Sequence, residues 1–293
     1  MKIAALGIAA AAVFAAHGAS AETIGIGSTK GTAVGQMATI LSKVVSSKAE
    51  GIELRPKNMG GSQKYIPVVN AGELQFGIAN IVQTTMAFEG KGLSEGKDYG
   101  NLRLAATLMA FRNGLLVKND SDIKIISDLK GKRVPSGFKG SPLFAFFFEG
   151  MMANGGVSMK DVKGIPAIGL GQSWGLLKQG KVDVVITAVG AAPVTPNMLK
   201  GVYYVDLQPS PKFPAIKAPT TTVGYDFMLF TSKDVSNETI GKVLKAIHGS
   251  EAEIKASSPL WTNYSSAGMA KDVGLQYHPG AEAFYKSAGV WKR

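Results

Sequence analysis

The chain contains no cysteine, and only three of its 293 residues are histidine. The absence of cysteine excludes disulfides, thiol nucleophiles, thiolate metal sites and lipid attachment through a cysteine. His17 lies in a segment that we expect to be removed, which leaves His248 and His278 for a metal site or a Ser-His-Asp triad. We therefore expect no catalytic residue, no metal and no cofactor.

Long hydrophobic runs are also scarce beyond the first residues. Lys2 precedes an apolar segment at 3–16, and Ala19-Ser20-Ala21 forms a small-x-small cleavage site, a pattern typical of a signal peptide. We expect a signal peptide over residues 1–21 and a mature chain that begins at Glu22 in the periplasm. No other uninterrupted apolar segment approaches the ~20 residues of a membrane-spanning helix.

The chain has fewer acidic than basic residues, 21 Asp and Glu and 32 Lys and Arg, which gives a net charge of +11. Such a field attracts anions at long range, although salt screens it beyond ~10 Å. The basic residues are scattered in singles and doubles, without a long basic run or interleaved aromatics. We therefore expect an anionic partner and no nucleic acid.

Glycine-rich polar loops recur between a strand-like segment and a helix-like segment. They follow Thr23–Gly27, Ile52–Leu54, Arg133-Val134 and Val182–Thr187. Repeated strand-loop-helix units predict an α/β fold of mainly parallel sheets flanked by helices.

Two of these elements recur later in the chain at one constant offset, which we call the internal repeat. Ile26-Gly27-Ser28 falls on Val134-Pro135-Ser136, and Gly72-x-Leu74-x-Phe76-x-Ile78 falls on Gly180-x-Val182-x-Val184-x-Ile186. The shared offset favours two lobes of similar topology, although common α/β patterns can coincide.

The lobes are not expected to be consecutive halves. The apolar stretch 104–117 predicts a strand that crosses into lobe two, and the segment after Gly224 predicts a strand that crosses back. We expect lobe one to comprise residues 22–117 and 225–293, and lobe two residues 118–224, with a ligand cleft between them. Two crossing strands would form a hinge.

The loops offer hydroxyls and main-chain N–H groups at helix starts, where unpaired N–H groups and the helix dipole suit an anion. A single loop of this kind is most often only a turn, whereas four that converge could hold a small carboxylate. The expected ligand residues are Ser28, Thr29, Thr32, Gly61, Ser62 and Asn80 of lobe one, and Ser136, Gly140, Ser141, Thr187 and Gly190 of lobe two. A nucleotide is disfavoured, because Thr32, and not lysine, follows Gly31.

Three further side chains are candidates for ligand contact. Arg112 and Lys139 could supply a cation for a carboxylate, although a solvated surface charge is the more common interpretation of each. Trp174 could form an aromatic wall of the cleft or merely anchor a helix. The stripe of Phe144, Phe147, Phe148 and Met151 has helical spacing and is interpreted as core.

Several motifs resemble the TAXI family, the extracytoplasmic solute-binding subunits of TRAP transporters. They are the early glycine-rich loop, Gly60-Gly61-Ser62, Gly72-Glu73, the segment 128–134, Gly137-x-x-Gly140-Ser141, Gly180-x-x-Asp183, Thr222-Val223-Gly224 and, most specifically, His278-Pro279-Gly280-Ala281-x-x-x-Tyr285. The segment 128–134 is shared more widely among periplasmic binding proteins.

This resemblance implies a two-lobed periplasmic binding protein of type II that closes over a small organic anion, of the dicarboxylate or acidic amino acid type. It also implies delivery to an integral membrane TRAP permease, and we expect a monomer. His278 is interpreted as structural. The sequence departs from the family at Ser28–Val34 and at Asn80, both at expected ligand positions, so the family's ligand does not carry over.

Three other functions stay open. The chain could be the binding subunit of an ATP-driven importer, which belongs to the same superfamily, or a sensor that presents its closed form to a membrane receptor. An exported hydrolase or transferase is disfavoured, since no G-x-S-x-G elbow is present and the histidines stand beside no obvious nucleophile.

Overall fold

The computed structural model describes residues 21–30, 32–140, 142–188, 202–207 and 220–291. Its strands are β1 (Glu22–Ser28), β2 (Ile52–Asn58), β3 (Phe76–Asn80), β4 (Leu102–Val117), β5 (Arg133–Gly137), β6 (Lys163–Ala167), β7 (Val184–Ala188), β8 (Val202–Leu207) and β9 (Thr220–Ser232). Its α-helices are α1 (Ala33–Lys48), α2 (Ser62–Asn70), α3 (Ile81–Glu89), α4 (Leu143–Ala153), α5 (Leu170–Lys178), α6 (Asn237–His248), α7 (Glu251–Ser257) and α8 (Pro279–Ser287). The expected signal peptide, except Ala21, lies outside the described residues, as do Ser141 and Gly190.

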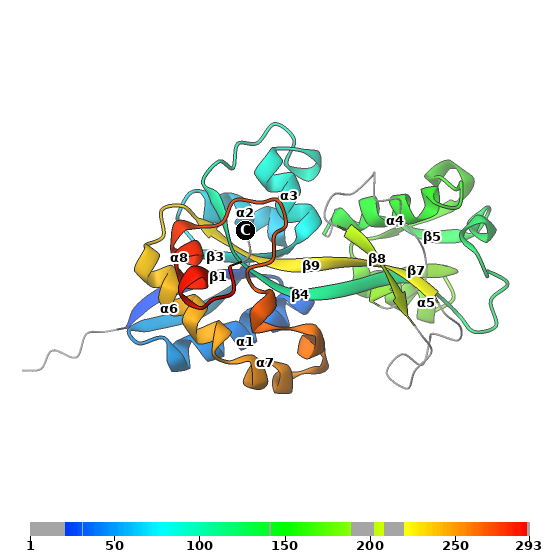
Figure 1. Cartoon of the computed structure of the whole chain (residues 1–293). Helices are drawn as coiled ribbons and strands as arrows, with labels where there is room; N and C mark the ends of the chain where they lie inside the picture. The colour runs from blue at the N-terminus through cyan, green and yellow to red at the C-terminus, as the bar shows by residue number, and fades with distance from the viewer. Residues whose placement is uncertain (1–20, 31, 141, 189–201, 208–219, 292–293) are drawn as a thin grey trace, which may run out of the picture.

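Two bodies of strands and helices are joined by the long strands β4 and β9 (Figure 1). Lobe one holds β1–β3, α1–α3 and α6–α8, and lobe two holds β5–β7, α4 and α5. The larger sheet has the order β2-β1-β3-β9-β4-β7, with β8 paired to β9, and β5 and β6 form a parallel pair. The two-lobed α/β architecture predicted from the sequence is confirmed.

The crossing strands β4 and β9 are antiparallel neighbours from Leu102 opposite Ser232 to Asn113 opposite Val223. They also bind each lobe separately, since β9 pairs with β3 and β4 pairs with β7. Register shifts interrupt their ladder between Leu104 and Ala106 and between Thr107 and Met109. The lobe boundaries at 117/118 and 224/225 and the hinge stay predictions, because the strands run on from one lobe to the other.

The internal repeat recurs in the elements themselves. Strand β7 begins and ends at the positions that the offset of the internal repeat gives for β3. Helix α5 likewise begins and ends at the positions that this offset gives for α2. A hydrogen bond recurs as well: Gly25 N donates to Gln75 Oε1, and Arg133 N donates to Asp183 Oδ2, each at 2.8 Å. The two lobes therefore share one topology, down to the way in which a side chain ties neighbouring strands.

The apolar stripe of α4 is core, as its spacing predicted. Phe147, Phe148 and Met151 are buried, Phe144 is half-buried, and the Phe147 ring stacks on Tyr225 of β9 with centroids 5.2 Å apart. The helix begins at Leu143, with Pro142 at the N-cap position.

His278 is buried and caps α8, as its interpretation as a structural residue anticipated. Its Nδ1 accepts from Gly280 N at 3.0 Å, so the ring proton lies on Nε2, which faces the Lys233 carbonyl at 3.3 Å. Burial lowers the pKa of His278, and Arg103 lowers it further, while the carbonyls of Lys233 and Val235 act in the opposite direction.

The lowered pKa of His278 makes stability depend on pH. As the pH falls below about 6.5, the unfolded chain takes up the proton first, so the free energy of unfolding should fall until the folded pKa is reached. His278→Asn keeps a cap acceptor without a titrating ring. Urea unfolding from pH 8 to pH 5 should show a shallower decline for this variant, and equal slopes would contradict the prediction.

Candidate functional site

The loops of lobe one lie where β1, β2 and β3 end and α1, α2 and α3 begin. Two of the expected ligand residues are helix caps: Thr32 Oγ1 accepts from Gly35 N at 3.4 Å, and Asn80 Oδ1 accepts from Gln83 N at 2.9 Å. Thr32 Oγ1 also donates to the Thr29 carbonyl at 2.7 Å. These side chains shape the loops at the starts of α1 and α3, and helix starts of this kind suit an anion.

Tyr65 gathers several of the expected residues around its hydroxyl. The Tyr65 hydroxyl donates to the Ile78 carbonyl and also interacts with the hydroxyls of Thr29 and Ser62. Its burial raises the pKa of Tyr65 far above the usual range, so the phenol stays neutral and polar at physiological pH. Tyr65 was not among the ligand residues expected from the sequence, and its place three residues after Ser62 was the available signal.

Gln83 joins the same cluster from α3. Ser62 Oγ donates to Gln83 Oε1, and Gln83 N is the group that Asn80 caps. The side chain of Gln83 is buried, and sequence reasoning missed it because helix periodicity alone does not separate a buried amide from core. Beside this cluster the buried Ser28 donates to Asn58 Oδ1 at 2.9 Å, which ties the ends of β1 and β2.

The loops of lobe two follow the carboxyl ends of its strands. Gly140 N donates to the Ile168 carbonyl and Phe138 N to the Ala167 carbonyl, each at 2.8 Å, which ties the loop after β5 to the end of β6. Lys139 and Gly140 are exposed, whereas Ser136 and Thr187 are half-buried. These residues therefore share the edge of lobe two at which β5, β6 and β7 end.

Trp174 lies on the same edge and repeats the role of Tyr65. Its Nε1 donates to the Ile186 carbonyl at 2.9 Å, and Ile186 is the counterpart, in the internal repeat, of Ile78, which accepts from Tyr65. Trp174 thus anchors α5 to β7, yet the residue is 45% exposed. Both interpretations made from the sequence, helix anchor and cleft wall, are compatible with this position.

The two edges face each other at Gly61 and Gly140. A Cβ atom added at Gly61 would lie 3.8 Å from the Gly140 carbonyl oxygen, at van der Waals distance, so the two loops approach each other closely. Gly61 has φ +142°, a conformation that favours glycine. The loops after β2 and β5, predicted from the sequence to converge, are thereby brought together.

Arg112 and Lys139 occupy different environments. Arg112 is half-buried on β4 opposite Gly224, and its Nε is shielded from solvent with no hydrogen-bond partner among the described residues. Two positions along β9, the carboxylate of Asp226 already pairs with Lys271. Because an unpaired buried donor costs ~1–3 kcal/mol, Arg112 is the better candidate for an added acceptor than the exposed Lys139.

Two surface hollows lie away from the contact between Gly61 and Gly140. The α1 hollow, about 500 Å³ in volume, adjoins the first loop, and its lining includes Lys30, Thr32, Gln36, Ile40, Asn58 and Ser258. The second hollow, about 390 Å³, lies at the amino ends of β5 and β7, opposite the edge that faces lobe one.

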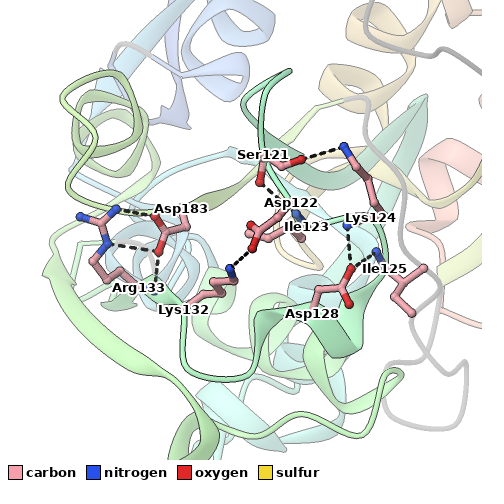
Figure 2. A network of polar contacts seen from close by, with 9 residues as sticks. All are labelled: Ser121, Asp122, Ile123, Lys124, Ile125, Asp128, Lys132, Arg133 and Asp183. Carbon is pink, nitrogen blue, oxygen red and sulfur yellow. Dashed lines mark hydrogen bonds and ion pairs between the residues drawn. The ribbon is translucent and has the colours of Figure 1, made fainter.

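Figure 2 shows the polar network at the second hollow. Arg133 pairs with Asp183 and holds the pKa of that carboxyl below its usual range, and Lys132 pairs with Asp122. The backbone N–H groups of Lys124 and Ile125 likewise lower the pKa of Asp128. Each of the three carboxylates has a partner, and the pair of Lys132 with Asp122 holds the loop of residues 121–128 next to the start of β5.

Within the described residues, no cluster of three or more His, Cys, Asp or Glu side chains could hold a metal ion. None of the described helices is both long enough and apolar enough to cross a membrane.

Known proteins share this fold. The profile of the NMT1-like family matches residues 24–197 and 209–289. PhnD1 from Prochlorococcus marinus, solved with methylphosphonate, is 12% identical with a TM-score of 0.58, over 92% of this chain and 98% of that chain. A structure described as a periplasmic transporter is 15% identical with a TM-score of 0.53, over 91% and 92% of the two chains.

A third solved structure is the alkanesulfonate-binding protein SsuA from Xanthomonas axonopodis pv. citri. It is 15% identical with a TM-score of 0.49, over 81% of this chain and 76% of that chain. At these identities the likenesses concern the fold, which is that of two-lobed periplasmic binding proteins.

Proposed function

The chain belongs to the NMT1-like family and has the fold of periplasmic solute-binding proteins, and we propose that it captures a small organic anion and delivers it to a TRAP-type membrane permease. The ligand is a carboxylate of the dicarboxylate or acidic amino acid type. The protein is exported, acts as a monomer and carries out no chemical reaction on its ligand.

The contact between Gly61 and Gly140 is the observation that carries this proposal. It brings together two glycine loops, each at the carboxyl end of a parallel strand and each on a different lobe. The lobe-one loop leads directly into α2, and beside it Thr29, Ser62 and Tyr65 supply hydroxyl groups. The Ser62 and Tyr65 hydroxyls already donate to Gln83 and to the Ile78 carbonyl, so the main-chain N–H groups at the start of α2 are the donors that would hold a carboxylate. Closure strengthens such bonds by excluding water.

The expected ligand residues divide between the two edges. Thr29, Thr32, Gly61, Ser62 and Asn80 lie at the edge of lobe one, with Ser28 behind them. Ser136, Lys139, Gly140, Trp174 and Thr187 lie at the edge of lobe two, and Arg112 lies on β4 between the lobes. Ser141 and Gly190 are proposed on their sequence positions alone.

Delivery to a TRAP permease rests on the resemblance of the motifs, above all the ending His278-Pro279-Gly280-Ala281-x-x-x-Tyr285. The alternative is a binding subunit of an ATP-driven importer. Gene neighbours test this part directly: a gene for a large membrane permease beside this gene supports the TRAP proposal, and an adjacent ATPase gene contradicts it.

Mass spectrometry of small molecules released from natively purified protein tests the ligand class. The expected result is an organic anion, whose addition to the emptied protein produces heat in calorimetry and raises the melting temperature. Succinate, glutamate and methylphosphonate are suitable first probes, the last because PhnD1 was solved with it. A neutral or cationic cargo, or no response to any organic anion, would contradict the proposal.

Arg112→Ala should weaken binding of the anion by about 10- to 100-fold, since a hydrogen bond to a charged group contributes ~1.5–3 kcal/mol. Arg112→Lys should bind with intermediate affinity, because it keeps the charge and loses the planar donor pair. Arg103→Ala is the matched control, since Arg103 lies on the same strand and donates to the carbonyls of Gly100 and Leu102. Calorimetry measures all three, and wild-type affinity in Arg112→Ala would dismiss its role.

A further inference from the structure

Two exposed apolar side chains flank the start of α5. Among the described residues, the large hydrophobic residues that are exposed are Ile125, Phe146, Ile168 and Trp174. Ile168 is 66% exposed and immediately precedes the N-cap Gly169, and Trp174, which is 45% exposed, lies in the second turn. Both follow the carboxyl end of β6, on the edge of lobe two that includes Gly140.

Hydrogen bonds hold the backbone of Ile168 and the side chain of Trp174 in place. Ile168 N donates to Gln172 Oε1 at 2.6 Å, and the Ile168 carbonyl accepts from Gly140 N at 2.8 Å. The indole N–H of Trp174 is bound to the Ile186 carbonyl. The indole therefore loses little conformational entropy when a ligand covers it.

The internal repeat indicates what this surface faces. By the offset of the internal repeat, Gly61 of lobe one corresponds to Gly169 of lobe two, and Thr32 of lobe one corresponds to Gly140 of lobe two. If the lobes are related as the internal repeat suggests, the counterpart of the approach between Gly61 and Gly140 would place the start of α5 opposite Thr32 of the first loop. The structure itself places Ile168 next to Gly140, since a Cβ atom at Gly140 would lie 3.0 Å from Ile168 Cγ2. On that side of lobe one lies the α1 hollow, with Lys30, Thr32 and the apolar Ile40 in its lining.

We infer that the ligand is an amphipathic organic anion, whose charged head lies near the loops of Gly61 and Gly140 and whose apolar arm lies against Trp174 and Ile168. This inference rests on the proposed function and narrows its ligand class. Lys30 and the main-chain N–H groups near Thr32 lie on the lobe-one side of the arm, so a polar end on the arm is also accommodated. A compact anion would leave the indole and the isoleucine exposed in the closed form.

Two homologous series test the length of the arm on the mature full-length protein: the dicarboxylates succinate, adipate, suberate and sebacate, and the n-alkyl phosphonates from methyl to hexyl. In whichever series binds, the dissociation constant should fall by about 3- to 4-fold per methylene that becomes buried. The fluorescence of Trp174 should also change on binding of the longer members. Affinity that is independent of chain length, or succinate that binds better than suberate, would overturn the inference.

Trp174→Ala should weaken binding of the longest ligand at least 10-fold and leave binding of the shortest ligand unchanged. Phe146→Ala is the matched control, an exposed aromatic residue of lobe two on α4. Ile168→Ser provides a second variant with little risk to folding and should weaken the longest ligand about 5-fold. If short anions bind and neither variant discriminates by chain length, the inference fails and the proposed function stands, whereas no binding of any anion defeats both.

Discussion

Gly61→Val should reduce affinity for the ligand by about 100-fold. The valine Cβ would touch the Gly140 carbonyl, and its two methyl groups would extend into that loop and hold the lobes apart. If the closed form falls to about 1% of the population, the apparent dissociation constant rises by that factor. The φ of +142° adds a backbone strain of ~1–3 kcal/mol, which lowers the melting temperature as well.

The Gly60→Val variant separates the effect of lobe closure on affinity from the effect of backbone strain on stability. Gly60 also has a positive φ, of +77°, but a Cβ atom there would meet nothing within 4 Å. This variant should therefore lose stability and keep most of its affinity. Calorimetry gives the affinities and X-ray scattering gives the degree of closure, and equal affinities in the two valine variants would show that the loops do not meet in the bound form.

Phe147→Ala should lower the free energy of unfolding by ~3–5 kcal/mol, the usual cost of truncating a fully buried phenylalanine. The Phe147 ring stacks on Tyr225, whose hydroxyl accepts from Asn113 Nδ2 at 2.8 Å. Helix α4 of lobe two is thereby fixed to both crossing strands, since Tyr225 lies on β9 and Asn113 on β4. The cavity left by Phe147→Ala would therefore weaken the packing of lobe two against β4 and β9, as well as the core around α4.

The neighbouring Phe146 provides the matched control for this prediction. Phe146 is 41% exposed and Phe147 is fully buried, although they are adjacent and chemically identical. Urea unfolding of Phe146→Ala should give a change within about 0.5 kcal/mol, as for most surface substitutions. Similar losses in both variants would contradict the described packing of α4.

The local elements could be predicted from the sequence because the interactions that form them span few residues. Ser236, a residue type that favours the N-cap, stands directly before α6 and accepts from Thr239 N at 3.0 Å. The apolar stretch 104–117 likewise identified β4, and the internal repeat identified the paired lobes. For α6 and β4, a hydrogen bond or a burial pattern within a short segment was sufficient to predict the element. The internal repeat required only the comparison of two such segments.

The polar cluster of lobe one depended on tertiary structure. Thr29, Ser62 and Asn80 were named from their loops, but Tyr65 and Gln83, which connect them, were not. Their hydroxyl and amide groups meet because α2 and α3 pack on the sheet next to β1 and β3. Pairings over such distances in the chain depend on sheet register, which no short pattern encodes.

By itself, the sequence determined the α/β class, the strand-loop-helix units, the repeated topology and the loops that offer N–H groups to an anion. Only the tertiary structure decided that Gly61 meets Gly140, that Trp174 is both bound and exposed, and that Arg112 rather than Lys139 has a shielded donor without a partner among the described residues. The physical reason is the distance along the chain between the interacting residues. Local hydrogen bonds and burial periodicity depend on residues that are close in the sequence. The approach of two lobes and the shielding of a side chain depend instead on how distant segments pack.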